Sequence, residues 1–328
     1  MRIDSATFQS MSLAGIQSNQ SSIARLSQQI STGLRMQTAK EDPIGSTKAL
    51  ELSNRIAIRT QYAENQTKAA NDLSYQSVVL DEMGGALDQA RSLFLSVSSS
   101  QSSAVQSGYA EQLKSVFNRL LDMANTQDTG GDYIFGGTAS NVKPFTNSSV
   151  NTVSGAPAIV EATLFDNEVA PGPAALSATR QLEIGAGHLV QVTDSIVNVM
   201  RFNDASLTDP ATDSEDHDVL QNLAHAMVSL QEGTMTEDKL RGYISVIAGA
   251  KDNLLAIQQR VAGAQTEIKD LRASTQSILL LEKNALSDLT QVDQAAAIVE
   301  LKSRQTTLEA VSRAYAMTSN LSLFNYIS

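Results

Sequence analysis

One long apolar stripe in the second half of the chain constrains the fold more than any other feature. Its members follow one another at alternating spacings of three and four residues, and only Thr275 among them is plainly polar. The stripe consists of Leu240, Tyr243, Ile247, Ala250, Leu254, Ile257, Val261, Ala264, Ile268, Leu271, Thr275 and Ile278. Over about five heptads it predicts one helix, roughly 55–60 Å long, that buries a narrow seam against other helices.

Further helical patterns lie on both sides of a central region with a different composition. We expect helices over residues 5–31, 109–123, 195–202 and 220–230. A further helix is expected to be capped by Ser46 and to end near residue 97, and the long helix is expected to start near Thr236. In the helix capped by Ser46, Leu73 begins a run of large apolar residues that recur every seven positions. The Gly84-Gly85 pair inside it predicts a close helix contact or a bend, since glycine otherwise weakens a helix.

The central region carries scattered prolines and glycines between short β-prone stretches. Residues 133–137 have a strand-like apolar run, and further strands are expected over 158–164, 180–184 and 188–193. The predicted fold is therefore mainly α, an elongated helical bundle formed by the N- and C-terminal segments with a small inserted β-rich domain. The expected domains are a terminal coiled-coil domain (1–45 with 284–328), a helical rod (46–142 with 195–283) and the insert (143–194).

Composition and charge exclude several classes of function. The net charge of −11 disfavours nucleic acid, because phosphate binding is driven largely by Lys and Arg. The chain has no cysteine, which rules out disulfides, thiol catalysis and cysteine-bound metals. No apolar stretch resembles a cleaved signal peptide or a membrane-spanning helix. We therefore expect neither a nucleic acid nor a membrane among the partners.

The residues offer little material for catalysis. Neither glycine pair at 130–131 or 136–137 has the context of a phosphate-binding loop, and no serine lies in a nucleophile elbow. His217 and the carboxylates of 213–218 form the one candidate metal site, but a solvated acidic loop that leads into a helix is the favoured interpretation. His225 is expected to be a partly buried packing residue. We predict no enzyme activity, no cofactor and no bound metal.

Both ends of the chain resemble the bacterial flagellin superfamily. Residues 30–36 (ISTGLRM) and 39–45 (AKEDPIG) are similar to its N-terminal signature, and 286–293 (LSDLTQVD), 260–264 (RVAGA) and 321–324 (LSLF) to its C-terminal segments. Within the superfamily, the opening MRI, the acidic residue before Pro43 and the segment 121–137 with the PF pair at 144–145 resemble the proteins of the hook–filament junction more than filament flagellins. The resemblance covers both helical flanks and leaves out the insert.

The resemblance implies an extracellular structural adaptor of the bacterial flagellum, exported without a cleaved signal peptide by the flagellar type III apparatus. The implied partners are other copies of the chain in a ring, the hook-side junction protein (hook-associated protein one), flagellin and a cytoplasmic export chaperone. Two alternatives stay open: a filament flagellin of unusual sequence, and an unrelated coiled-coil binding module or enzyme.

The terminal stripes are too weak to hold a helix pair alone. A buried leucine contributes about 1.5–3 kcal/mol, whereas ordering the backbone costs about 1–2 kcal/mol per residue. We therefore expect both termini to be largely disordered in the free subunit and to fold on assembly. The expected assembly interface comprises Leu13, Ile16, Ile23, Ile30, Leu301, Leu308, Val311, Tyr315, Leu321, Leu323 and Phe324.

Overall fold

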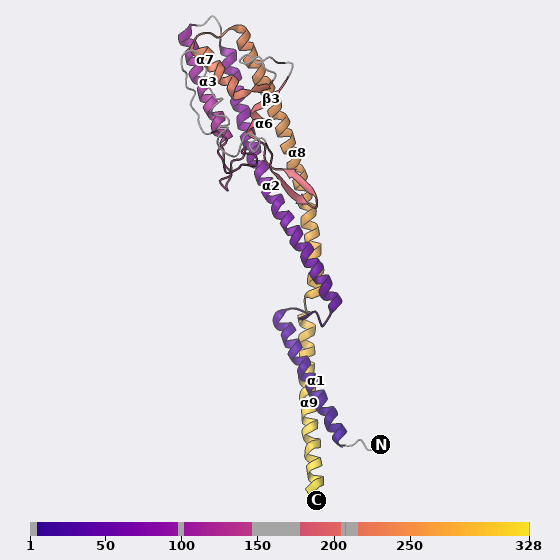
Figure 1. The fold of residues 1–328 in the computed structure, drawn as a ribbon. Helices are drawn as coiled ribbons and strands as arrows, with labels where there is room; N and C mark the ends of the chain where they lie inside the picture. The colour runs from indigo at the N-terminus through magenta and orange to yellow at the C-terminus, as the bar shows by residue number, and fades with distance from the viewer. Residues whose placement is uncertain (1–4, 98–101, 146–177, 205–206, 208–215, 328) are drawn as a thin grey trace. The chain divides into compact units, whose positions relative to one another are not determined.

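Helices dominate the computed structural model, which describes residues 5–97, 102–145, 178–204, 207 and 216–327 (Figure 1). In chain order the elements are α1 (Ser5–Thr32), α2 (Pro43–Ser96), α3 (Ser103–Ala124), β1 (Gln181–Gly185), β2 (His188–Gln191), α6 (Ile196–Met200), β3 (Arg201–Asn203), β4 (Asp216–Asp218), α7 (Val219–Gln231), α8 (Glu237–Thr290) and α9 (Gln294–Ile327). The prediction of a mainly α protein with a minor β component is confirmed. Within the described residues, no helix combines the length and hydropathy that crossing a bilayer requires.

The chain divides into two compact units. Residues 1–60 and 277–328 form one, here called the terminal unit, and residues 61–276 form the other, here called the bundle unit. The long helices α2 and α8 contribute residues to both units. Each unit is described by itself below.

The bundle unit has one continuous apolar core made by its helices. α3 and α7 pack side by side (Figure 1), and their buried leucines join those of α2 and α8 in a single cluster. The rings of Phe94 and Tyr243 stack with centroids 5.8 Å apart. A Cβ on Gly84 would lie 3.2 Å from Leu254, which confirms the predicted close helix contact at the glycine pair.

Two small antiparallel sheets accompany these helices. β1 pairs with β2 in a hairpin that aligns Gln181 with Gln191, and Gly187 supplies the positive φ of 69° that its turn requires. β3 pairs with β4, aligning Arg201 with Asp218. The hairpin matches the strands expected over 180–184 and 188–193, whereas the strand expected over 158–164 lies outside the described residues.

Three local predictions were wrong. α2 begins at Pro43 and is capped by Asp42, whose Oδ1 accepts the Gly45 amide at 2.8 Å, instead of by Ser46. Residues 133–137 form turns with isolated bridges instead of a strand, because Gly137 bends the run with a φ of 61°. The helix expected over 195–202 ends at Met200, and the chain continues into β3.

Candidate assembly surfaces and polar networks

The helices α1 and α9 pack against each other in the terminal unit (Figure 1). Among its described apolar residues, only Leu26, Leu279 and Ala297 are buried. Sequence reasoning missed Leu26 because it placed Ser27 on the stripe, although both residues follow Ile23 at helical spacing. The described side chains of the terminal unit thus form almost no core of their own.

The predicted assembly residues occupy intermediate positions between core and surface. Leu13 is 45% exposed. The other described members of the set are half-buried; they are Ile16, Ile23, Ile30, Leu301, Leu308, Val311 and Tyr315. The positions 321, 323 and 324 lie within α9, but the structure does not describe their side chains. None of the described members is buried, so they do not form a closed core.

Many other apolar side chains of the terminal unit face solvent. The exposed large ones are Met11, Leu13, Leu34, Ile44, Leu50, Ile58, Leu280, Leu281, Ile298, Val299 and Met317. Val299, for example, is 70% exposed and Ile298 beside it is 46% exposed. Ile298 and Val299 are neighbours in α9, as Leu280 and Leu281 are in α8, and exposed apolar side chains that gather in this way are a mark of protein–protein contact.

Backbone pairing joins the loop after α1 to the end of α8. The amide of Arg35 donates to the Thr290 carbonyl at 2.7 Å, and the amide of Val292 donates to the Gly33 carbonyl at 3.0 Å. The bridge between Leu34 and Gln291 lies between these two bonds. The structure therefore brings the N- and C-terminal signature segments together inside the terminal unit.

A buried carboxylate connects α2 and α8 in the same unit. The side chain of Glu282 is 7% exposed and forms ion pairs with Arg55 at 2.7 Å and Arg59 at 3.0 Å. Glu282 follows Thr275 by seven residues, so it occupies the seam of the long stripe. The ion pairs therefore join α2 to α8 just beyond the point where the apolar stripe ends.

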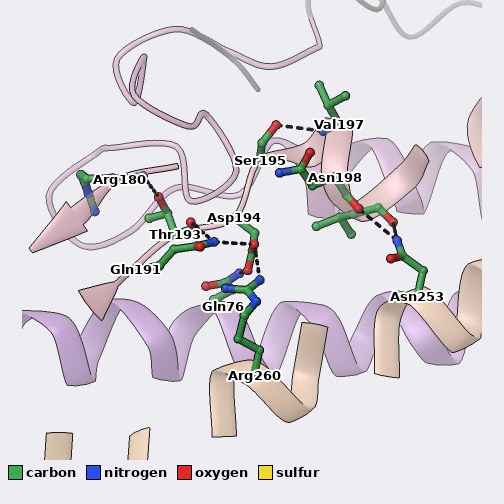
Figure 2. A network of polar contacts seen from close by, with 11 residues as sticks. Gln76, Arg180, Gln191, Thr193, Asp194, Ser195, Val197, Asn198, Asn253 and Arg260 are labelled. Carbon is green, nitrogen blue, oxygen red and sulfur yellow. Dashed lines mark hydrogen bonds and ion pairs between the residues drawn. The ribbon is translucent and has the colours of Figure 1, made fainter. Parts of the chain in front are cut away.

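Asp194 is the centre of a polar network in the bundle unit (Figure 2). Its carboxylate is 3% exposed and pairs with Arg260 of α8 and with the amide of Gln76 in α2. Gln191 donates to the same carboxylate at 2.8 Å. Next in the chain, the Ser195 hydroxyl caps α6 by accepting the Val197 amide at 3.1 Å. The segment between β2 and α6 is therefore tied to both long helices.

Asn253 adds a second tie from α8 to α6 in the same view (Figure 2). Its side-chain amide donates to the backbone carbonyls of Asn198 at 3.0 Å and Val199 at 3.2 Å. These carbonyls belong to the short helix α6, whose last carbonyls have no partner within the helix. Asn253 thereby fixes α6 against the long helix.

A small hollow lies on the bundle unit beside Asp72. Its lining comprises Asp72, Tyr75, Asp128, Asp132, Tyr133, Ile134, Arg180 and Thr193. Asp72 pairs with Arg180 at 2.9 Å, and burial raises the pKa of the Asp72 carboxyl against the opposing effect of that guanidinium. Asp128 accepts the backbone amides of 130 and 132 at 2.7 and 3.0 Å. The carboxylates of this hollow are therefore engaged in holding the local fold.

His217 does not lie in a solvated loop as predicted. Its side chain is fully buried in β4, 5.2 Å from the ring of Phe202, and its Nε2 lies 3.3 Å from the Asp204 carbonyl oxygen. The prediction of a solvated loop rested on the acidic residues next to His217 in the sequence. The apolar residue that buries it, Phe202 of β3, lies elsewhere in the chain. Among the described residues, no group of three potential ligands is placed to hold a metal ion.

The other two histidines differ in their surroundings. His225 is half-buried on α7, as expected for a packing residue. His188 lies on β2, with its Nε2 2.6 Å from the Glu267 carboxylate of α8. Both therefore have places in the fold of the bundle unit.

Comparisons with known proteins agree with the architecture. Residues 3–140 match the family model described as the bacterial flagellin N-terminal helical region. The chain is 25% identical to flagellar hook-associated protein 3 of Escherichia coli strain K12, over 99% of both chains.

Solved structures share the fold. A putative flagellar hook-associated protein from Vibrio parahaemolyticus has a TM-score of 0.59 at 18% identity, covering 76% of this chain and 100% of that chain. The flagellar junction protein FlgL from Legionella pneumophila has a TM-score of 0.52 at 15% identity, covering 68% and 99%. Residues 3–140 thus match the flagellin N-terminal helical region, and the chain is similar over its full length to flagellar hook-associated protein 3.

Proposed function

We propose that this chain is a structural subunit of the bacterial flagellum that joins the hook side to the flagellin filament through its terminal helices. The exposed apolar side chains of the terminal unit carry this proposal. Val299 is 70% exposed, whereas Ala297, on nearly the opposite side of the same helix, is buried at 5%. α9 therefore presents apolar residues on more than one face. A helix that is apolar on several faces is suited to burial among several neighbours.

Energetics favour assembly as the event that orders this unit. Burying one exposed leucine, isoleucine or valine contributes about 1.5–3 kcal/mol, and a neighbouring copy would cover several of them at once. We infer that the termini are largely disordered in the free subunit and fold in a ring of copies. The domain division into a terminal coiled-coil domain, a helical rod and an inserted β-rich domain is part of the same proposal.

The proposed partners follow from this role. They are further copies of the chain, a hook-side junction protein on one side and flagellin on the other. An export chaperone would hold the apolar C-terminal helix before secretion by the flagellar type III apparatus, without a cleaved signal peptide. The role is mechanical and needs no catalysis, cofactor or membrane anchor.

Deletion of the gene tests the junction role. We expect non-motile cells with intact hooks, no filaments and flagellin shed into the culture medium. Filaments on normal hooks in the deletion strain would contradict the proposal. Complementation with Val299→Asp should restore export but not filaments, whereas Leu255→Asp, which changes an exposed leucine of the bundle unit, should restore swimming.

A filament flagellin paralogue is the second candidate, because the matched family model describes the flagellin N-terminal region. The abundance of the protein in sheared filaments separates the two functions. A filament subunit would be a major component of the sheared material, whereas a junction subunit would be a trace component that stays with the hook.

Hydrogen exchange on the free subunit tests the ordering of the termini. We expect amides of residues 5–30 to exchange rapidly before assembly and slowly in the assembled structure. Strong protection of these amides in the free subunit would overturn the proposed folding on assembly.

A further inference from the structure

Helices α2 and α8 run antiparallel in the bundle unit, and their apolar seam repeats every seven residues. Gly84 faces Leu254, and Asp88 pairs with Lys251. Residue numbers thus increase along α2 while those of the facing residues on α8 decrease. The stacked pair Phe94 and Tyr243 continues this order. A seam of equally spaced apolar residues packs almost as well after a slip of one heptad. Apolar packing alone therefore leaves the register of the two helices weakly specified.

Buried polar side chains interrupt this repeat at matching places. Gln66 occupies the same heptad position as Leu73, Leu80, Leu87 and Phe94. On α8, Thr275 occupies the same position as Ile247, Leu254, Val261 and Ile268. Gln66 is fully buried and donates to the Thr275 hydroxyl at 3.0 Å and to the Ile184 carbonyl of β1 at 2.8 Å. The polar interruption of one helix thus meets the polar interruption of the other.

A second polar interruption lies ten residues farther along α2. Gln76 shares its heptad position with Ala69, Met83 and Ala90, and it is fully buried. Its amide meets the buried carboxylate of Asp194, which also pairs with Arg260 of α8. Asp194 therefore bridges the two helices at a fixed axial position.

We infer that the Gln66–Thr275 pair and the Gln76–Asp194–Arg260 cluster, together called the polar rungs, specify the register of α2 against α8. A slip of one heptad would place Gln66 opposite Ile268 or Glu282, and it would separate Asp194 from either Gln76 or Arg260. Each displaced polar group would then be buried without its partner, which is strongly unfavourable. A single buried polar pair is known to select register in helical seams at some expense of stability.

The segment from Arg180 to Ser195 is part of the same arrangement. It contacts α2 through Asp72, and α8 through Glu267, in addition to the polar rungs. The isoleucine at 184, fully buried, sits between these contacts. The segment 180–195 therefore contacts both long helices. It can make all of these contacts at once only when α2 and α8 are in their native register.

Disulfide trapping in the cysteine-free chain tests this inference. The native-register pair is Gly84→Cys with Leu254→Cys, and the slipped-register pairs are Gly84→Cys with Ile247→Cys or with Val261→Cys. Facing Cβ atoms about 3.5–4.5 Å apart can form a disulfide, whereas a seven-residue displacement moves a partner by roughly 10 Å along the helix. With the polar rungs intact, we expect oxidation to link only the native pair.

The decisive variant replaces the polar rungs by apolar side chains of similar size. It combines Gln66→Met, Thr275→Val, Gln76→Met and Asp194→Leu, leaving Arg260, whose side chain is 42% exposed, free to turn to solvent. We expect a helical protein in which a slipped pair rises from background to a yield comparable with the native pair. Exclusive linking of the native pair in this variant would overturn the inference.

A matched control separates register from stability. Leu80→Ala removes a fully buried side chain from the same seam but leaves every polar rung intact. We expect it to lower stability without producing a slipped disulfide, and slipped linking in this control would also overturn the inference. If circular dichroism shows that the four-residue variant is unfolded, Gln66→Met with Thr275→Val is oxidised instead. Because one polar rung remains, we expect a smaller slipped yield that still exceeds the parent's, and a slipped yield no higher than the parent's would overturn the inference.

Discussion

The amide of Arg35 and the carbonyl of Thr290 are joined by a hydrogen bond of 2.7 Å, although the two residues come from opposite ends of the chain. The bond closes the loop after α1 onto the last turn of α8, and the Val292 amide completes the pairing at the Gly33 carbonyl. Gly33 adopts a φ of 72°, in the left-handed region that glycine enters without strain. The pairing therefore depends on a glycine at this position.

We predict that Gly33→Ala weakens this pairing, because a Cβ at positive φ costs about 1–2 kcal/mol. The amides of Arg35 and Val292 should then exchange with solvent about 5–30 times faster. Hydrogen exchange resolved to single amides measures the effect.

The same substitution at Gly15 is the control for this prediction. Gly15 lies inside α1 with open space around its Cα, so an added methyl meets nothing. Gly15→Ala should leave exchange at Arg35 and Val292 unchanged. If both variants accelerated hydrogen exchange at these two amides equally, the helix content of α1, and not the φ of Gly33, would govern the pairing.

The Glu282 ion pairs predict an asymmetry between their two sides. Glu282 is buried, whereas the side chains of Arg55 and Arg59 are 51% and 32% exposed. Replacing both arginines by glutamine strands a carboxylate and should cost about 3 kcal/mol, whereas Glu282→Gln lets the arginines return to water and should cost about 1 kcal/mol. The hydrogen-exchange protection of residues 50–60 measures the cost in each variant. A larger loss of protection in Glu282→Gln than in the double arginine variant would contradict the asymmetry.

The apolar seam between α2 and α8 shows why the sequence predicted the long helix but did not predict its polar contacts. The stripe from Leu240 to Ile278 predicted a long helix correctly, because its periodicity is a local property of the sequence. Thr275 was an unexplained polar member of that stripe, since its partner Gln66 lies on another helix. The fold class could therefore be predicted, whereas the polar rungs could not.

Residues whose surroundings come from distant segments were predicted poorly. His217 is flanked by acidic residues in the sequence but is buried against Phe202 of the paired strand β3. Asp42 is a different kind of error, because its signal is local: aspartate is a preferred helix cap and proline a preferred first helical residue. All of the expected assembly residues remain predictions, and the structure does not describe the side chains of 321, 323 and 324.

Asp218 predicts a pH dependence of the bundle unit. Burial raises the pKa of its carboxyl above the usual 3.8, against the opposing hydrogen bonds from the Gln221 and Leu220 amides and the charge of Arg201. A raised folded-state pKa gives stability that is fully present below the unfolded-state value and is lost as the pH rises through the folded-state pKa. Relative to Asp218→Asn, which keeps the capping oxygen, the parent protein should thus lose stability as the pH rises above 3.8.

Urea unfolding at a series of pH values measures this difference. Asp218→Ala is the comparison variant, because it removes the oxygen that accepts the Leu220 and Gln221 amides at 3.0 and 3.1 Å. Loss of that cap should cost about 1 kcal/mol. A stability difference between the parent and Asp218→Asn that is flat across the window, or that grows in the parent's favour as the pH rises, would contradict the prediction.

Two glycines of α8 predict opposite responses to the same substitution. A Cβ on Gly249 would lie 2.6 Å from Cε2 and 2.8 Å from Cζ of the Phe202 ring, and 3.2 Å from Leu207. Gly263 lies in the same helix with nothing within 4 Å of an added Cβ. Gly249→Ala must push the Phe202 ring away from α8 and should cost about 1–3 kcal/mol, whereas Gly263→Ala should stabilise the helix by about 0.5–1 kcal/mol. Urea unfolding of the two variants measures both effects, and stabilisation by Gly249→Ala would mean that the Phe202 ring does not lie against Gly249.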